Sequence, residues 1–78
     1  MVEFIVLEKK SDGKWEGHGT HSFKATPRVG EHIEMNDDDG IGQTYEVVAV
    51  VHPLEPTMTA GDLIIRHAGR STDWRGSL

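Results

Sequence analysis

The chain has 78 residues, no cysteine and a formal net charge of −5. This length suffices for one small hydrophobic core, and the absence of cysteine excludes disulfides, iron–sulfur clusters and thiolate zinc sites. Because small secreted domains usually need disulfides, and because neither a signal peptide nor a long apolar run is visible, we expect a cytoplasmic protein that does not enter a membrane.

Two strands joined by a hairpin are predicted at the start of the chain. Residues 2–10 are rich in Phe, Ile and Val, and residues 14–26 alternate between apolar and polar side chains, as a half-buried strand does. The Asp12-Gly13 pair between them predicts a two-residue turn, because both central residues of a type I′ turn need a positive φ.

This turn fixes a register in which the apolar faces of the two strands coincide. It places Phe4 opposite His21 and Lys9 opposite Glu16, an opposite-charge pair across the strands. The face of the second strand that is expected to turn inward comprises Trp15, Gly17, Gly19, His21, Phe23 and Ala25.

The middle of the chain predicts a second hairpin, with strands at residues 32–36 and 43–52 around an acidic, glycine-punctuated loop. A plain two-residue turn at Asp39-Gly40 would mismatch the apolar faces, so we expect an odd shift in register, supplied by a bulge at Gly42. Because the strand at residues 43–52 is apolar on both faces, we expect it to lie inside the sheet.

Residues 62–68 predict a fifth strand, and a short helical turn is expected around residues 57–60. Five short strands predict an all-β fold: a small five-stranded antiparallel, partly open barrel of the SH3-like or OB-like kind. We expect a single domain over residues 1–68 and a polar, flexible tail over residues 69–78. No motif points to a particular family.

Neither a metal site nor a cofactor is expected, although the chain has five histidines. His18 and His21 lie three apart on a predicted strand and so face opposite ways. The other histidines are spread over separate predicted strands: His32, His52 and His67. The acidic loop partly imitates a calcium-binding loop, but Met35 stands where the first ligand would be.

No catalytic constellation is visible either. The sequence lacks a glycine-rich phosphate loop and a nucleophile elbow, and the neighbours His21 and Ser22 face opposite ways on a strand. We therefore expect a protein that is not an enzyme.

The aromatic residues allow two interpretations. Trp15, Phe23 and Tyr45 are expected inside the barrel as core residues, although small barrels also use such side chains to stack bases. Trp74, beside Arg75 in the predicted tail, either anchors a partner or folds back over an open end of the barrel.

The acidic middle of the chain is the main functional signal, because residues 29–61 carry seven acidic side chains and no Lys or Arg. We expect a non-catalytic interaction module, or a small subunit of an assembly, whose partner is a protein with a basic surface. The expected interaction residues are Glu34, Asp37, Asp38, Asp39, Trp74 and Arg75. The alternative is a nucleic-acid-binding barrel that uses the Arg-bearing C-terminal segment, but an acidic middle disfavours nucleic acid.

Overall fold

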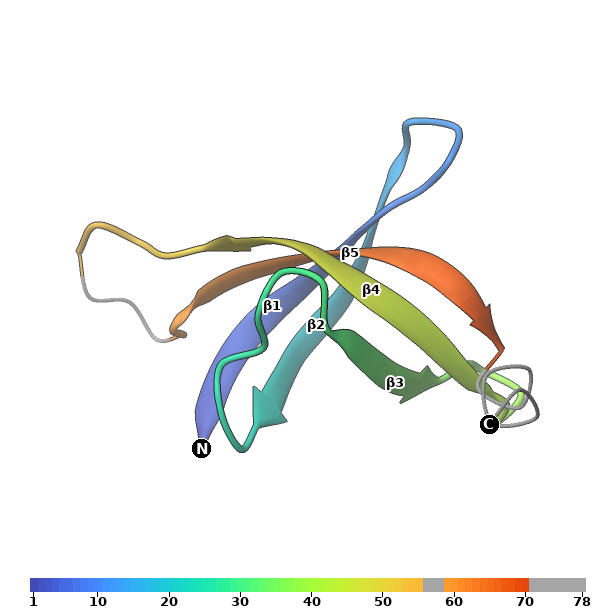
Figure 1. The fold of residues 1–78 in the computed structure, drawn as a ribbon, viewed down its shortest axis with the longest axis horizontal. Coiled ribbons are helices and arrows are strands. Elements are labelled where there is room, and N and C mark those ends of the chain that lie inside the picture. The colour runs from blue at the N-terminus through green and yellow to red at the C-terminus, as the bar shows by residue number, and fades with distance from the viewer. Residues whose placement is uncertain (56–58, 71–78) are drawn as a thin grey trace.

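A computed structural model describes residues 1–55 and 59–70, and this part of the chain forms five strands and no helix (Figure 1). The strands are β1 (Val2–Lys9), β2 (Trp15–Phe23), β3 (His32–Asn36), β4 (Gly42–Val51) and β5 (Gly61–Arg70). They form one sheet in the order β2-β1-β5-β4-β3, which curls through 214° into a half-barrel. The predicted all-β, partly open barrel is confirmed.

The sheet is mixed, so the prediction of purely antiparallel pairing is wrong. β5 runs antiparallel to β4 but parallel to β1. One edge of β1 is already paired with β2, and β5 joins the other edge after the chain has crossed to β3 and β4. Turn signals report only the pairing of consecutive strands, and this contact joins two strands from opposite ends of the chain.

The β1–β2 hairpin has a three-residue turn where a two-residue turn was predicted. The Gly13 amide donates to the Lys10 carbonyl over 2.9 Å, and the Lys10 amide donates to the Lys14 carbonyl over 2.8 Å. Gly13 has a φ of 85°, so the loop is a type I turn followed by a left-handed glycine. The extra residue shifts the pairing near the turn, and Lys9 therefore faces Trp15 and not Glu16.

A bulge within β2 then restores the predicted register. The pairing shifts between Ile5 and Leu7 of β1, opposite Gly19, which has a φ of 77°. Beyond this point Phe4 faces His21, as predicted. Residues 15–18 of β2 lie between the turn and the bulge. The faces of this segment are exchanged relative to the prediction, because a shift of one residue moves every side chain to the other face.

The inward face predicted for the first half of β2 is consequently wrong. Trp15 is 57% exposed, and Gly17 and Gly19 are also exposed. His18, which was expected to point outward, is instead partly buried.

The β3–β4 hairpin repeats the same three-residue turn. The Gly40 amide donates to the Asp37 carbonyl over 3.0 Å, the Asp37 amide donates to the Ile41 carbonyl over 2.9 Å, and Gly40 has a φ of 78°. The expected odd shift is present, since Ile33 faces Tyr45. It arises from the length of the turn and not from a bulge at Gly42.

The core lies on the concave face of the curled sheet. Six side chains are buried there: Phe4, Val6, Tyr45, Val47, Leu63 and Ile65. Each large apolar side chain removed from water contributes about 1.5–3 kcal/mol. The Phe23 ring, expected in the core, packs edge-on against Phe4 at a centroid distance of 6.3 Å. Tyr45 and Phe23 thus lie where the sequence predicted, whereas Trp15 does not.

The last strand continues through Gly69 and Arg70, which the sequence analysis assigned to the tail. Residues 71–78, including Trp74 and Arg75, lie outside the described part of the chain, and so does the first half of the helical turn predicted around residues 57–60. Among the described residues no helix has the length and apolar character to cross a membrane.

Candidate functional site

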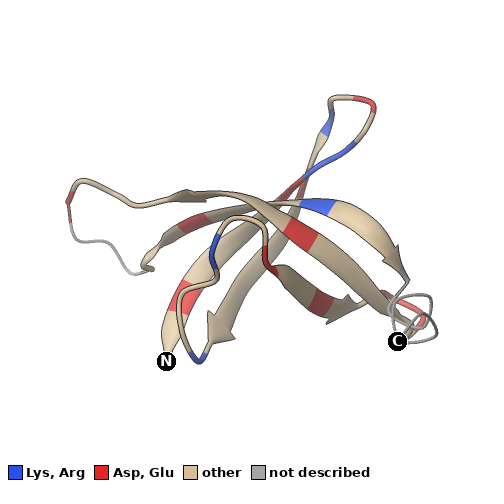
Figure 2. Ribbon diagram, viewed as in Figure 1, with Lys and Arg blue, Asp and Glu red and all other residues tan. Residues whose placement is uncertain are grey.

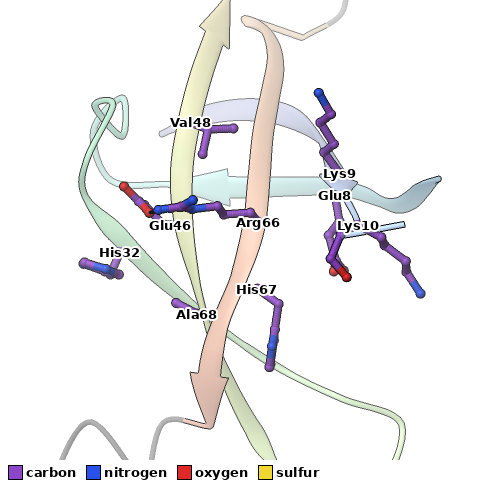
Figure 3. Close-up of a pocket in the computed structure, with 10 residues that line it drawn as sticks. Glu8, Lys9, Lys10, His32, Glu46, Val48, Arg66, His67 and Ala68 are labelled. Carbon is purple, nitrogen blue, oxygen red and sulfur yellow. Dashed lines mark hydrogen bonds and ion pairs between the residues drawn. The ribbon is translucent and has the colours of Figure 1, made fainter. Parts of the chain in front are cut away.

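Polar side chains gather on the concave face where β1 and β5 separate. The last residue pair between these strands is Glu8 with Ile65, and beyond it β5 continues beside β4 alone. An open groove begins here, lined by residues of β1 and the following turn, by His32 at the start of β3, and by residues of β4 and β5 (Figure 3): Glu8, Lys9, Lys10, Ser11, His32, Glu46, Val48, Arg66, His67 and Ala68. Glu8 is the lining residue that also belongs to the group of polar side chains described next.

At this point two carboxylates and an imidazole converge, and we call Glu8, Glu16 and His18 the inner cluster. Glu8 is 7% exposed and faces Glu16 directly across β1 and β2. His18 Nε2 lies 2.9 Å from Glu8 Oε1 and 3.6 Å from Glu16 Oε2. The second oxygen of Glu16 lies 3.6 Å from Lys10 Nζ in a half-exposed pair. An imidazole nitrogen therefore lies between two acidic groups.

Tyr45 borders the inner cluster on the β4 side. Its ring lies 5.7 Å from the His18 ring and 5.4 Å from the His67 ring, the latter in an edge-on contact. Burial raises the pKa of the Tyr45 hydroxyl, and the negative charges of Glu8, Glu16 and Asp37 raise it further. The Tyr45 hydroxyl therefore lies within the field of three acidic side chains.

A hydrogen-bonded chain connects this interior to the β3–β4 turn. His67 Nε2 lies 2.8 Å from Gln43 Oε1, and Gln43 Nε2 donates to Asp37 Oδ2 over 3.0 Å. Asp37 Oδ1 accepts from the amides of Asp39 and Ile41, over 3.0 and 2.9 Å. The aspartate that organises the turn is therefore Asp37.

The predicted interaction residues divide into three groups. Glu34 on β3 and Asp38 and Asp39 at the turn are exposed and lie together at one end of the sheet (Figure 2). Asp37 is partly buried, and its side chain accepts hydrogen bonds from amides of the turn. The remaining two, Trp74 and Arg75, lie outside the described residues.

The inner cluster was missed by the sequence analysis because it depends on the three-residue turn, which puts Glu16 and His18 on the inner face. The bulge at Gly19 lies between His18 and His21, so both histidines turn inward, and His21 Nε2 lies 2.8 Å from the His18 carbonyl. The argument that these two histidines face opposite ways is therefore wrong. A glycine inside an alternating strand is itself a signal for a bulge, and it was the available clue.

Comparison of the chain with protein-family models, curated proteins and solved structures finds no match. Function is therefore inferred from the arrangement of the described side chains.

Proposed function

We propose that the protein is a non-catalytic interaction module, or a small subunit of an assembly, that presents an acidic edge to a basic protein surface. The acidic edge consists of Glu34, Asp38 and Asp39. The observation that carries this proposal is the exposure of all three side chains along an edge strand and its turn. Edge strands are common sites of protein association, because their outer side is not covered by another strand of the sheet.

The distribution of opposite charge supports this assignment. Among the described side chains, Lys and Arg lie at the β1–β2 hairpin, in the segment from β2 to β3, and at Arg66 of β5 (Figure 2). Arg66 Nε donates to Glu46 Oε1 over 2.7 Å. The described side chains thus give the acidic edge a negative field, which speeds and orients the approach of a basic partner.

The turn itself does not account for its three aspartates. Asp37 makes the side-chain hydrogen bonds that shape it, whereas Asp38 and Asp39 add repulsive charge at its tip. Like charges at this spacing oppose folding, with only partial relief by salt. A role in recognition explains why both are acidic.

The remaining sequence-based expectations stay predictions. They are the SH3-like or OB-like kinship of the barrel, its cytoplasmic location and the absence of catalysis. The nucleic-acid alternative also stays a prediction: Arg66 in the C-terminal segment is paired with Glu46, and the side chains of Arg70 and Arg75 lie outside the described part of the chain.

The test compares proteins captured from cell extract by three forms of the purified chain. The first is the wild type, and the second is the acidic-edge variant Glu34→Gln/Asp38→Asn/Asp39→Asn, which retains Asp37. The third is a control with the same change in charge elsewhere, Glu3→Gln/Glu55→Gln/Asp62→Asn. An exposed ion pair contributes about 0.2–1 kcal/mol, so loss of three should weaken partner binding by about 3-fold to 150-fold.

The proposal requires a protein that binds the wild type and the control equally and the acidic-edge variant more weakly, and that is released by salt. Equal capture by both variants would contradict it. Capture that disappears after nuclease treatment would favour the nucleic-acid alternative.

A further inference from the structure

The position of Glu8 is energetically unfavourable without a neighbouring positive charge. Its carboxyl group is largely removed from water, with a side-chain exposure of 10%, and Glu16 stands directly opposite on β2. Like charges that face each other across a ladder destabilise the sheet, and a buried carboxylate needs compensation by a cation or by hydrogen bonds. The group that contacts Glu8 is His18, which is charged only when protonated.

The geometry of the inner cluster matches what a metal ion requires. One nitrogen from His18 and one oxygen each from Glu8 and Glu16 all lie within 4.8 Å of one another. A tetrahedral zinc ion with bonds of about 2.0–2.1 Å holds its ligand atoms about 3.3 Å apart. The distances from His18 Nε2 to the two carboxylates, 2.9 and 3.6 Å, lie on either side of this value.

The cluster also differs from a solvated acidic patch. It includes an imidazole nitrogen, and one of its carboxylates is buried. The register of the β1–β2 hairpin brings its three members together. The three-residue turn pairs Glu8 with Glu16, and His18, two residues after Glu16 and before the bulge, lies on the same face of β2. Glu16 is half exposed, which gives an ion access from solvent.

From this geometry we propose that Glu8, Glu16 and His18 bind a divalent transition-metal ion of the zinc class. One imidazole and two carboxylates suit zinc, cobalt and nickel, whereas magnesium and calcium prefer oxygen ligands alone. Three protein ligands leave one coordination position for water or a partner's side chain. The site is separate from the acidic edge, so this inference and the proposed function stand or fall independently.

The test is calorimetric titration of zinc into the chelator-treated chain, freed of any histidine tag. One zinc ion should bind per chain and raise the melting temperature, because an ion that binds only the folded state stabilises it. Cobalt should bind at the same place and give visible absorption characteristic of mixed nitrogen and oxygen ligation. Magnesium and calcium at the same concentration should produce neither effect.

Three ligand variants and two controls locate the ion. Glu8→Gln, Glu16→Gln and His18→Gln should each weaken zinc affinity by at least about tenfold, since even residues that only orient metal ligands have effects of 10–100-fold. The controls His52→Gln and Glu3→Gln remove the same groups outside the cluster and should bind zinc like the wild type.

The melting temperature of each variant without metal shows whether it is folded. Glu16→Gln is the variant expected to fold normally, because Glu16 is half exposed. A folded wild type that fails to bind zinc would overturn the proposal. Zinc bound equally by the wild type and by folded Glu16→Gln and His18→Gln variants would also overturn it, and would assign the ion to other side chains.

Discussion

Tyr45 is the residue whose chemistry best reports the environment inside the half-barrel. It is the one tyrosine of the chain, it is 7% exposed, and its ring lies between those of His18 and His67. Burial is the largest cause of its raised pKa, and the carboxylates of Glu8 and Glu16 follow. The pKa of Tyr45 thus depends both on burial in the core and on the charges of the inner cluster.

The ionisation of Tyr45 should therefore occur at higher pH in the folded protein than in the unfolded chain, whose tyrosine pKa is about 10. Because the folded state holds this proton more tightly, the stabilisation is complete below about pH 10 and is lost as the pH rises through the higher, folded pKa. Tyrosinate absorbance in a metal-free pH titration measures this directly.

Glu8→Gln should lower the Tyr45 pKa toward the ordinary value without restoring it, since burial remains. The exposed control Glu3→Gln should leave it unchanged. A Tyr45 pKa that is the same in the wild type, in Glu8→Gln and in the unfolded chain would show that the inner cluster does not have this arrangement.

Asp37 and Asp38 are adjacent and equally charged, yet they should differ in their effect on stability. Asp37→Ala removes the acceptor of two turn amides and of Gln43, and loss of such a cap costs about 0.5–2 kcal/mol. Asp38→Ala, at an exposed position, should change the free energy of unfolding by less than about 0.5 kcal/mol. Denaturant unfolding of both variants measures the difference, and equal effects would contradict the role of Asp37.

At the level of the strands, glycines in the left-handed conformation determine which side chains face inward. Gly13 and Gly40 lengthen both hairpin turns by one residue, and Gly19 reverses the shift within β2. The sequence predicted five strands close to their observed bounds because alternation and turn residues are local signals. It misplaced Trp15 and His18 because two- and three-residue turns share the same Asp-Gly signature, and one residue of slip exchanges the faces.

Two glycines of β2 provide a matched test of this mechanism. Gly19→Ala should cost about 1–2 kcal/mol, because a side chain at a φ of 77° is strained although nothing lies within 4 Å of the added atom. Gly17 lacks a positive φ, and an added methyl group would only touch Leu7 at 3.9 Å, so Gly17→Ala should be neutral or slightly stabilising.

Loss of the bulge should change which residues beyond Gly19 face inward. In Gly19→Ala the pairing of Phe4 with His21 and the ring contact of Phe4 with Phe23 should be lost, whereas Gly17→Ala should retain both. NMR contacts of the Phe4 ring report the change. Persistence of these contacts in a folded Gly19→Ala variant would show that the bulge does not place His21 and Phe23.

On the scale of the whole molecule, the sheet order is the feature that the sequence could not supply. The parallel contact between β1 and β5 joins segments far apart in the chain, and no turn residue or alternation pattern records it. That contact closes the core around Phe4, Val6, Leu63 and Ile65, and its end at Glu8 opens the groove. The exposed acids Glu34, Asp38 and Asp39 were predictable, since an acidic stretch without Lys or Arg is visible in the sequence alone.

In the half-barrel the β1–β2 hairpin carries lysines and acidic residues together, whereas β3 and the turn after it carry acidic residues without Lys or Arg (Figure 2). The most direct measurement of the proposed function is an amide NMR titration with a short peptide of alternating Lys and Thr, and with a matched Glu and Thr peptide. We predict salt-sensitive shifts confined to residues 32–41 for the Lys peptide on the wild type. No such shifts are expected for the Glu peptide or for the acidic-edge variant. Shifts that persist in that variant, or that lie on the β1–β2 hairpin, would contradict the proposal that the acidic edge is the interaction surface.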